Sequence, residues 1–192
     1  MRNYLFLLFA LGIISCSVGK EGFNLKPSRI IKPEFTKQIR LDGLYFGIFP
    51  DQENKMRLFL FFFYNNGICS LSGFASDNFK SNSGIDSILA FCKRNYSEEK
   101  KFDSSFDYGG FTRKEKNIEV QVLRYVSQFK WSTCSFQGRI INDTTLFMSN
   151  CDFQARPNFC VDSFYLHFKK TEKIDSAKNN NWINKSWYWS NN

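Results

Sequence analysis

The stretch KMRLFLFFFYNNGICSLSGF, residues 55–74, predicts two β-strands joined by a tight turn at NNG, residues 65–67. β-Branched and aromatic residues favour strands. In the first strand, apolar residues occupy both faces beyond residue 57. Because a strand with one face in water alternates apolar and polar residues, we expect both faces of this strand to be covered. One face consists of Met56, Leu58, Leu60, Phe62 and Tyr64, and the other of Phe59, Phe61 and Phe63.

Two segments could cover the face formed by Phe59, Phe61 and Phe63. The first is a helix that begins near Ser83, where Asp86 three residues later resembles a capping box. The apolar residues of this segment recur on one helical face. They are Ile85, Ile88, Leu89 and Cys92.

The second candidate cover is the carboxy-terminal tail, in which Trp182, Trp187 and Trp189 stand among Asn and Lys residues. Tryptophan is favoured at interfaces, where its apolar ring is shielded from water. Three placements suit such a tail: packing on its own domain, lying at a lipid surface, or holding a partner. Packing on its own domain is the simplest of the three.

The remaining chain predicts further strands by period-two alternation between short turns. With the two strands of 55–74 they make eight antiparallel strands that follow one another in sequence. Closure removes the unpaired edges of an open meander. The sequence therefore predicts a mainly β fold, an antiparallel up-and-down β-barrel of about eight strands with one inserted α-helix. The other strands are expected at 43–49, 108–114, 118–125, 131–141, 144–151 and 161–169.

Three hairpin segments carry a family resemblance. LDGLYFG (41–47), GGFTRKEKNIEVQV (109–122) and GRIINDTTLF (138–147) are similar to segments of the uncharacterised lipocalin-like lipoproteins of Gram-negative bacteria. The likeness covers most of residues 40–170 and implies a calycin-type barrel. Its motifs are hairpin signatures, so it implies no activity.

The amino-terminal residues have the layout of a signal peptide. Arg2 precedes the apolar stretch 4–14, which is shorter than the roughly 20 residues of a membrane-spanning helix. The order IISC at 13–16 resembles the lipobox of bacterial lipoproteins. By this resemblance, residues 1–15 are removed and Cys16 carries a thioether-linked diacylglycerol and usually an N-acyl chain, with palmitate among the acyl groups. The alternative is an ordinary secreted protein whose Cys16 happens to follow the signal.

These features predict the organisation and location of the chain. Residues 16–39, which contain Pro27 and Pro33, are expected to be a lipidated tether or loosely docked arm. Residues 40–170 form the barrel, and 171–192 the Trp-rich tail. The protein is expected in the cell envelope, lipid-anchored to the outer membrane on its periplasmic face or at the cell surface.

The formal net charge of +8 is spread along the chain, with basic residues near both ends. Two interpretations stay open: these segments lie against anionic head groups, or the charge keeps an aromatic-rich protein soluble. A nucleic-acid partner is not expected, because the predicted export and anchoring argue against one. The basic residues near the ends are Lys26, Arg29, Lys32, Lys37 and Arg40, and Lys169, Lys170, Lys173, Lys178 and Lys185.

The sequence offers little that is typical of an enzyme. His167 is the single histidine and stands in an alternating strand, where a lone histidine is usually a surface residue. The sequence contains no GxSxG, HExxH or glycine-rich phosphate loop. We therefore expect no enzymatic activity, no cofactor and no metal site.

Register predicts a disulfide between Cys134 and Cys151. If Asn142 and Asp143 form a two-residue turn, residues whose numbers add to 285 face each other, and these two cysteines do so. Cys151 with Cys160 is the rival if the turn is longer or a bulge shifts the register. Pairing of Cys69 with Cys92 would tie strand to helix but rests on no such geometry.

Two functions remain open. In the first, side chains fill the barrel and the protein is a non-enzymatic interaction module, anchored through Cys16, with an envelope protein as partner. In the alternative, it is a lipocalin-like carrier that binds a small apolar or amphipathic molecule inside the barrel. A filled interior is usual for small barrels, which favours the first.

Overall fold

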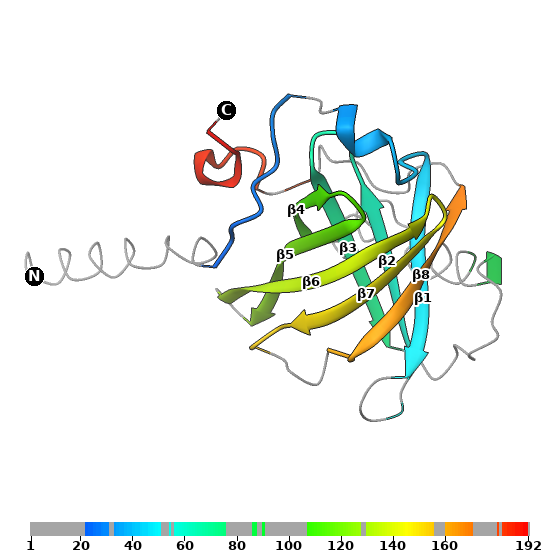
Figure 1. The fold of residues 1–192 in the computed structure, drawn as a ribbon. Coiled ribbons are helices and arrows are strands. Elements are labelled where there is room, and N and C mark those ends of the chain that lie inside the picture. Colours follow the sequence, from blue (N-terminus) through cyan, green and yellow to red (C-terminus); the bar gives the residue numbers. More distant parts are fainter. Residues whose placement is uncertain are drawn as a thin grey trace, which may run out of the picture.

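The computed structural model contains a closed barrel of eight antiparallel strands (Figure 1). It describes residues 22–30, 33–50, 54, 56–75, 86–87, 90, 107–127, 130–155, 160–170, 180 and 182–191. Each strand pairs with the next in sequence, and β8 pairs with β1. The strands are β1 (Gly43–Pro50), β2 (Met56–Phe63), β3 (Ile68–Ala75), β4 (Asp107–Lys114), β5 (Asn117–Ser127), β6 (Lys130–Asn142), β7 (Thr145–Asp152) and β8 (Ser163–Lys170). The mainly β, up-and-down barrel predicted from the sequence is confirmed.

Little helix accompanies the barrel in the described residues. The 3-10 helices η2 (Pro33–Thr36) and η5 (Ser186–Tyr188) lie in the segments before β1 and after β8. Of the helix expected after Ser83, only Asp86, Ser87 and Ala90 are described, and all three are helical. The rest of that segment, and residues 1–16, lie outside the described residues. No helix in the described part of the chain is long and apolar enough to cross a bilayer.

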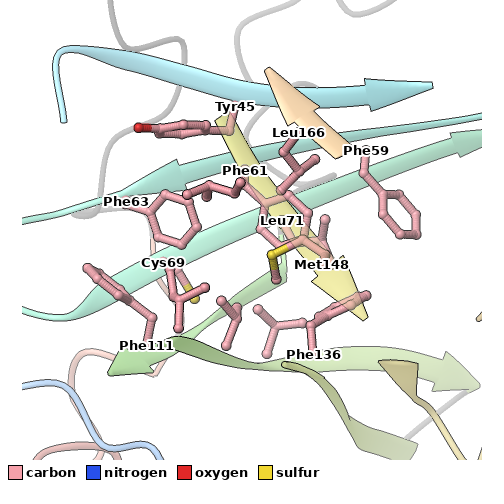
Figure 2. Close-up of a cluster of buried hydrophobic side chains, with 14 of the residues drawn as sticks. Tyr45, Phe59, Phe61, Phe63, Cys69, Leu71, Phe111, Phe136, Met148 and Leu166 are labelled. Atoms are coloured by element: carbon pink, nitrogen blue, oxygen red, sulfur yellow. The ribbon is translucent and has the colours of Figure 1, made fainter. Parts of the chain in front are cut away.

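Both faces of β2 are covered, as expected, but the assignment of the two faces was wrong. Phe59, Phe61 and Phe63 point into the barrel, where they contact residues of other strands (Figure 2). The opposite face, with Leu58 and Leu60, packs against the terminal segments outside the barrel. Alternation fixes that neighbouring side chains point to opposite sides. It does not fix toward which side the sheet closes.

Aromatic side chains fill the inside of the barrel. Phe59 and Phe61 are fully buried, and their ring centroids lie 6.0 and 5.5 Å from that of Phe136. The ring centroid of Phe63 lies 4.9 Å from that of Phe111 on β4. Edge-to-face contacts of this kind add to the gain from burying apolar surface. The interior is thus a packed core to which all eight strands contribute side chains.

A second core lies outside the barrel, between β1–β5 and the two terminal segments. Phe23 stacks on Tyr188 with 5.5 Å between ring centroids. Leu25 N–H donates to Gln121 Oε1 at 3.1 Å. A Cβ at Gly110 would overlap the carbonyl oxygen of Leu25, so the arm crosses β4 where that strand has no side chain. The tail therefore packs on its own domain, and the arm is more closely docked than a loose tether.

The predicted Cys134–Cys151 disulfide was wrong. Cys151 is bonded to Cys160, with 5.3 Å between the Cα atoms. Cys134 has a free thiol, is buried in the barrel interior and faces Val122 of β5. Cys69 is also free and buried, and Cys92 lies outside the described residues.

The cause of this error is the register of β6 and β7. Asn142 pairs with Thr145, so the turn lies one residue later than expected. Two irregularities along the same pair of strands shift the register again before Ser135 meets Asp152. Cys134 is therefore displaced from Cys151. The rival pairing, which required such a shift, is confirmed.

Replacing Cys160 with serine is expected to destabilise the barrel by about 2.5 kcal/mol. Cys151 and Cys160 are separated by 9 in sequence, and the chain-entropy model gives about this value for so short a loop. Urea unfolding of the oxidised protein and of the Cys160→Ser variant measures the difference. As a control, a reductant should lower the stability of the unaltered protein and leave Cys160→Ser unchanged. An equal effect of reductant on both would contradict the assignment.

Candidate functional site

The outer face of β6, β7 and β8 exposes apolar side chains. Ile141 is 48% exposed and Tyr165 is 55% exposed. Half-buried Phe147 lies between them in the sheet, with 5.1 Å between its ring centroid and that of Tyr165. Clustered exposed apolar residues of this kind are typical of interaction surfaces.

The pairing of the strands places the cation of Arg139 in line with these two aromatic rings. Arg139 of β6 is opposite Phe147 of β7, and Phe147 is opposite Tyr165 of β8. Side chains directly opposite each other on one face of a sheet interact. The three residues therefore form one row across three strands.

The row lies in a shallow groove of about 520 Å³, here called the outer groove. Its lining combines apolar side chains with polar and charged ones, as protein interfaces do. The residues that line it include Glu119 of β5, Gln137, Arg139 and Ile141 of β6, Phe147 of β7, and Tyr165 of β8.

The charges in the outer groove are available to a partner. Arg139 and Glu119 are both exposed, and neither forms an ion pair with any residue that the structure describes. Gln137 is engaged, because its Oε1 accepts a hydrogen bond from Asn150 Nδ2 at 3.1 Å. The groove thus offers one cation and one anion beside an aromatic pair.

A second hollow, of about 600 Å³, lies at the end of the barrel where β1 begins. Two of its charged residues, Arg40 and Asp42, pair with each other. Nη2 of Arg40 lies 2.7 Å from Oδ2 of Asp42. The guanidinium carbon of Arg40 lies 4.4 Å from the centre of the Phe168 ring. The hydrogen bond from Arg40 keeps the pKa of Asp42 below its usual value.

Tyr45 closes the same end of the barrel. Its hydroxyl donates to the carbonyl oxygen of Asp143 at 2.6 Å and accepts from the backbone N–H of Arg40 at 2.9 Å. Burial raises the pKa of Tyr45 to about 12, so the hydroxyl stays protonated at neutral pH. These contacts join β1 to the β6–β7 turn and to the segment before β1.

The residues singled out in the sequence lie apart from one another. His167 is exposed on the outer side of β8, opposite Thr145. Burial raises the pKa of the Cys69 and Cys134 thiols, so neither is an activated nucleophile. Cys16 lies outside the described residues. Within the described ranges, no group of three His, Cys, Asp or Glu side chains is placed to hold a metal ion.

The outer groove was not predicted from the sequence. One signal was present: Ile140 and Ile141 are consecutive, so one of them had to face outward from a strand. In the sequence, Tyr165 alternates with Phe164 and Leu166 and so points away from the face that these two residues form. Its proximity to Phe147 follows only from the pairing of β7 with β8.

Comparisons of the chain with models of protein families, with curated proteins and with solved structures find no match. A barrel fold by itself does not indicate a role, since one fold hosts many functions. The functional conclusion therefore has to come from the surfaces of the barrel.

Proposed function

We propose that this chain is a lipid-anchored, non-enzymatic interaction module of the bacterial cell envelope, and that its outer groove binds another envelope protein. The observation that carries the proposal is the row of Arg139, Phe147 and Tyr165, whose cation has no ion pair among the described residues. Aromatic residues and arginine are the types enriched at protein interfaces.

The chemistry of the groove points to the kind of partner. The formal net charge of the chain is +8, so an acidic protein would be attracted to it. An apolar side chain of that partner would lie on Phe147 and Tyr165, and a neighbouring carboxylate would pair with Arg139. Arginine suits this role because its planar guanidinium binds a carboxylate through two hydrogen bonds.

The packed interior supports a module rather than a carrier of small apolar molecules. A carrier needs an open chamber inside its barrel. Here the rings of Phe59, Phe61 and Phe136 meet across the interior, and Met148 and Leu166 fill space beside them (Figure 2). A ligand would have to displace these buried side chains, because protein interiors are close-packed.

Changing Cys16 to alanine tests the anchor. Two or three acyl chains, at about 0.8 kcal/mol per buried CH₂, hold a protein stably on a membrane. The variant should accumulate as uncleaved precursor and fail to incorporate labelled palmitate. Ser17→Ala, beside the anchor, is the matched control and should be processed normally. Labelling and processing of Cys16→Ala like those of the unaltered chain would refute acylation.

A photo-crosslinking residue in place of Tyr165 tests the groove. In cells it should form one adduct of defined mass, and Arg139→Glu should reduce that adduct at least tenfold, as expected for a central interface residue. The control carries the same crosslinker at Tyr125, which is 52% exposed on β5 outside the groove. The same adduct from both positions, or an adduct insensitive to Arg139→Glu, would exclude the groove as the binding surface.

A further inference from the structure

The described parts of the two ends of the chain, residues 22–30 and 182–191, lie side by side on the outside of the barrel (Figure 1). The backbone N–H of Ser190 donates to the carbonyl oxygen of Pro27 at 2.9 Å, which joins the two segments directly. Their outward surface is here called the terminal face.

The charge of the terminal face has one sign. Lys26, Arg29 and Lys185 are exposed on it, and the sequences of the two segments contain no acidic residue. The guanidinium carbon of Arg29 lies 5.5 Å from the centre of the Trp189 ring, so this cation of the amino-terminal segment contacts the carboxy-terminal segment that carries Lys185. Within the described residues, none of the three cations has an ion pair.

Apolar residues accompany these cations. Ile30 is 64% exposed, the most exposed of the large apolar side chains described. Trp187 is half-buried, with its ring centroid 6.2 Å from that of Phe23. Tryptophan at the boundary of apolar and polar surroundings, together with lysine and arginine, is typical of surfaces that lie at the head-group level of a bilayer.

The length of chain before the terminal face limits its distance from the proposed anchor. Cys16 precedes Gly22 by six residues. At full extension, six residues span at most about 20 to 22 Å. An acylated Cys16 would therefore keep Gly22, where the described amino-terminal segment begins, within that distance of the lipid head groups.

We propose that the terminal face binds the anionic head groups of the membrane that holds Cys16. That this membrane is the one that holds Cys16 rests on the proposed function, which includes the lipid anchor. No residue of the outer groove belongs to the terminal face, and in Figure 1 β6, β7 and β8 cross the front of the barrel while both terminal segments lie to the left. The lipid surface and the protein partner can therefore be bound together.

Vesicle flotation tests the surface without the anchor. A chain that begins at residue 17 keeps every described contact, because these lie within residues 22–191. It should float with vesicles that contain phosphatidylglycerol and stay behind with vesicles of phosphatidylcholine alone. Added salt should release it, because screening weakens attraction between exposed charges.

Two matched triple variants locate the binding surface. Lys26→Gln, Arg29→Gln and Lys185→Gln together should weaken binding on the order of 100-fold, since each cation near an anionic surface contributes about fivefold, or about 1 kcal/mol. The control variant also loses three positive charges, from exposed positions elsewhere. It should bind vesicles nearly as well as the unaltered chain does. It combines Lys37→Gln, Arg139→Gln and Lys170→Gln.

A second pair of variants tests the apolar part. Ile30→Asn should weaken vesicle binding severalfold, whereas Ile141→Asn, at a residue of similar exposure in the outer groove, should not. Both residues are exposed, so equal melting temperatures should show that both variants fold.

Three results would overturn the inference: no flotation with anionic vesicles, equal flotation with both vesicle types, or an equal loss of binding in the two triple variants. The chain tested carries no lipid, so the fate of Cys16→Ala in cells does not affect the result. If flotation fails and Cys16 is acylated, only the terminal face is refuted. If flotation succeeds and Cys16 is not acylated, only the anchor is refuted.

Discussion

Replacing Phe61 with alanine is expected to cost about 3 to 5 kcal/mol of stability. Phe61 is fully buried at the centre of the barrel, with its ring centroid 6.2, 6.0 and 5.5 Å from those of Phe59, Phe63 and Phe136. The strands of a closed barrel are hydrogen-bonded on both sides, so they cannot move inward to fill the cavity. The cost is a large share of the 5 to 15 kcal/mol that stabilises a typical domain.

Urea unfolding followed by tryptophan fluorescence measures this loss. Tyr165→Ala, which removes a side chain that is 55% exposed, is the control and should cost no more than about 1 kcal/mol. If Phe61→Ala unfolded at nearly the urea concentration of the unaltered protein, the interior could not be a tightly packed core. The carrier alternative would then regain support.

Strand order was predictable because it depends on local signals, and closure was predictable because an open meander would leave unpaired edges. The turn at Asn66 and Gly67 lies between two apolar runs, and Gly67 has the positive φ of 82° that the turn requires. The apolar run of β2 beyond Arg57 also indicated that both of its faces are covered. Which face is inside was not predictable, because that depends on the direction in which the whole sheet closes.

The disulfide depended on a longer chain of inference. From the turn, the register of β6 and β7 had to hold over seven residues to bring Cys134 opposite Cys151. The turn is displaced by one residue, and the register shifts again along the pair. Such shifts follow from packing against neighbouring strands, which is not visible in the sequence of one hairpin.

The candidate site was the least predictable part. Phe147 and Tyr165 belong to strands that pair only in the folded barrel, and Arg139 joins them through a third strand. Each residue by itself fits an ordinary strand pattern. The terminal face is similar, since basic residues at both ends were visible in the sequence but their meeting on one surface depends on tertiary packing.

Tyr188 fastens the tail to the barrel, and Tyr188→Ala is expected to cost about 3 to 5 kcal/mol, as for other buried aromatic residues. Its hydroxyl donates to the carbonyl oxygen of Gly109 at 2.9 Å and accepts from Asn180 Nδ2 at 2.8 Å. Its ring stacks on Phe23 of the arm. Removing this residue should therefore loosen both terminal segments.

Tyr188→Phe separates the hydrogen bonds from the packing. The variant keeps the ring and leaves Asn180 and the Gly109 carbonyl without their partner, which should cost about 1 to 3 kcal/mol. Tyr165→Phe, at an exposed hydroxyl, is the matched control and should be nearly neutral. A neutral Tyr188→Phe would mean that these two hydrogen bonds do not hold the tail.

Tyr188→Phe and the unaltered chain should differ in the stability that they lose at alkaline pH. Burial raises the pKa of Tyr188 above the value of about 10 that tyrosine has in an unfolded chain. The contribution of Tyr188 to the free energy of unfolding is therefore complete below about pH 10. It is lost as the pH rises further, because Tyr188 loses its proton more readily in the unfolded chain than in the folded one. Tyr45 adds a similar loss in both proteins, since its pKa is also raised, to about 12. Urea unfolding at neutral pH and at about pH 11 measures how far the free energy of unfolding falls between the two. This fall should be smaller for Tyr188→Phe than for the unaltered chain. Equal falls in the two proteins would mean that the Tyr188 hydroxyl is not buried in solution.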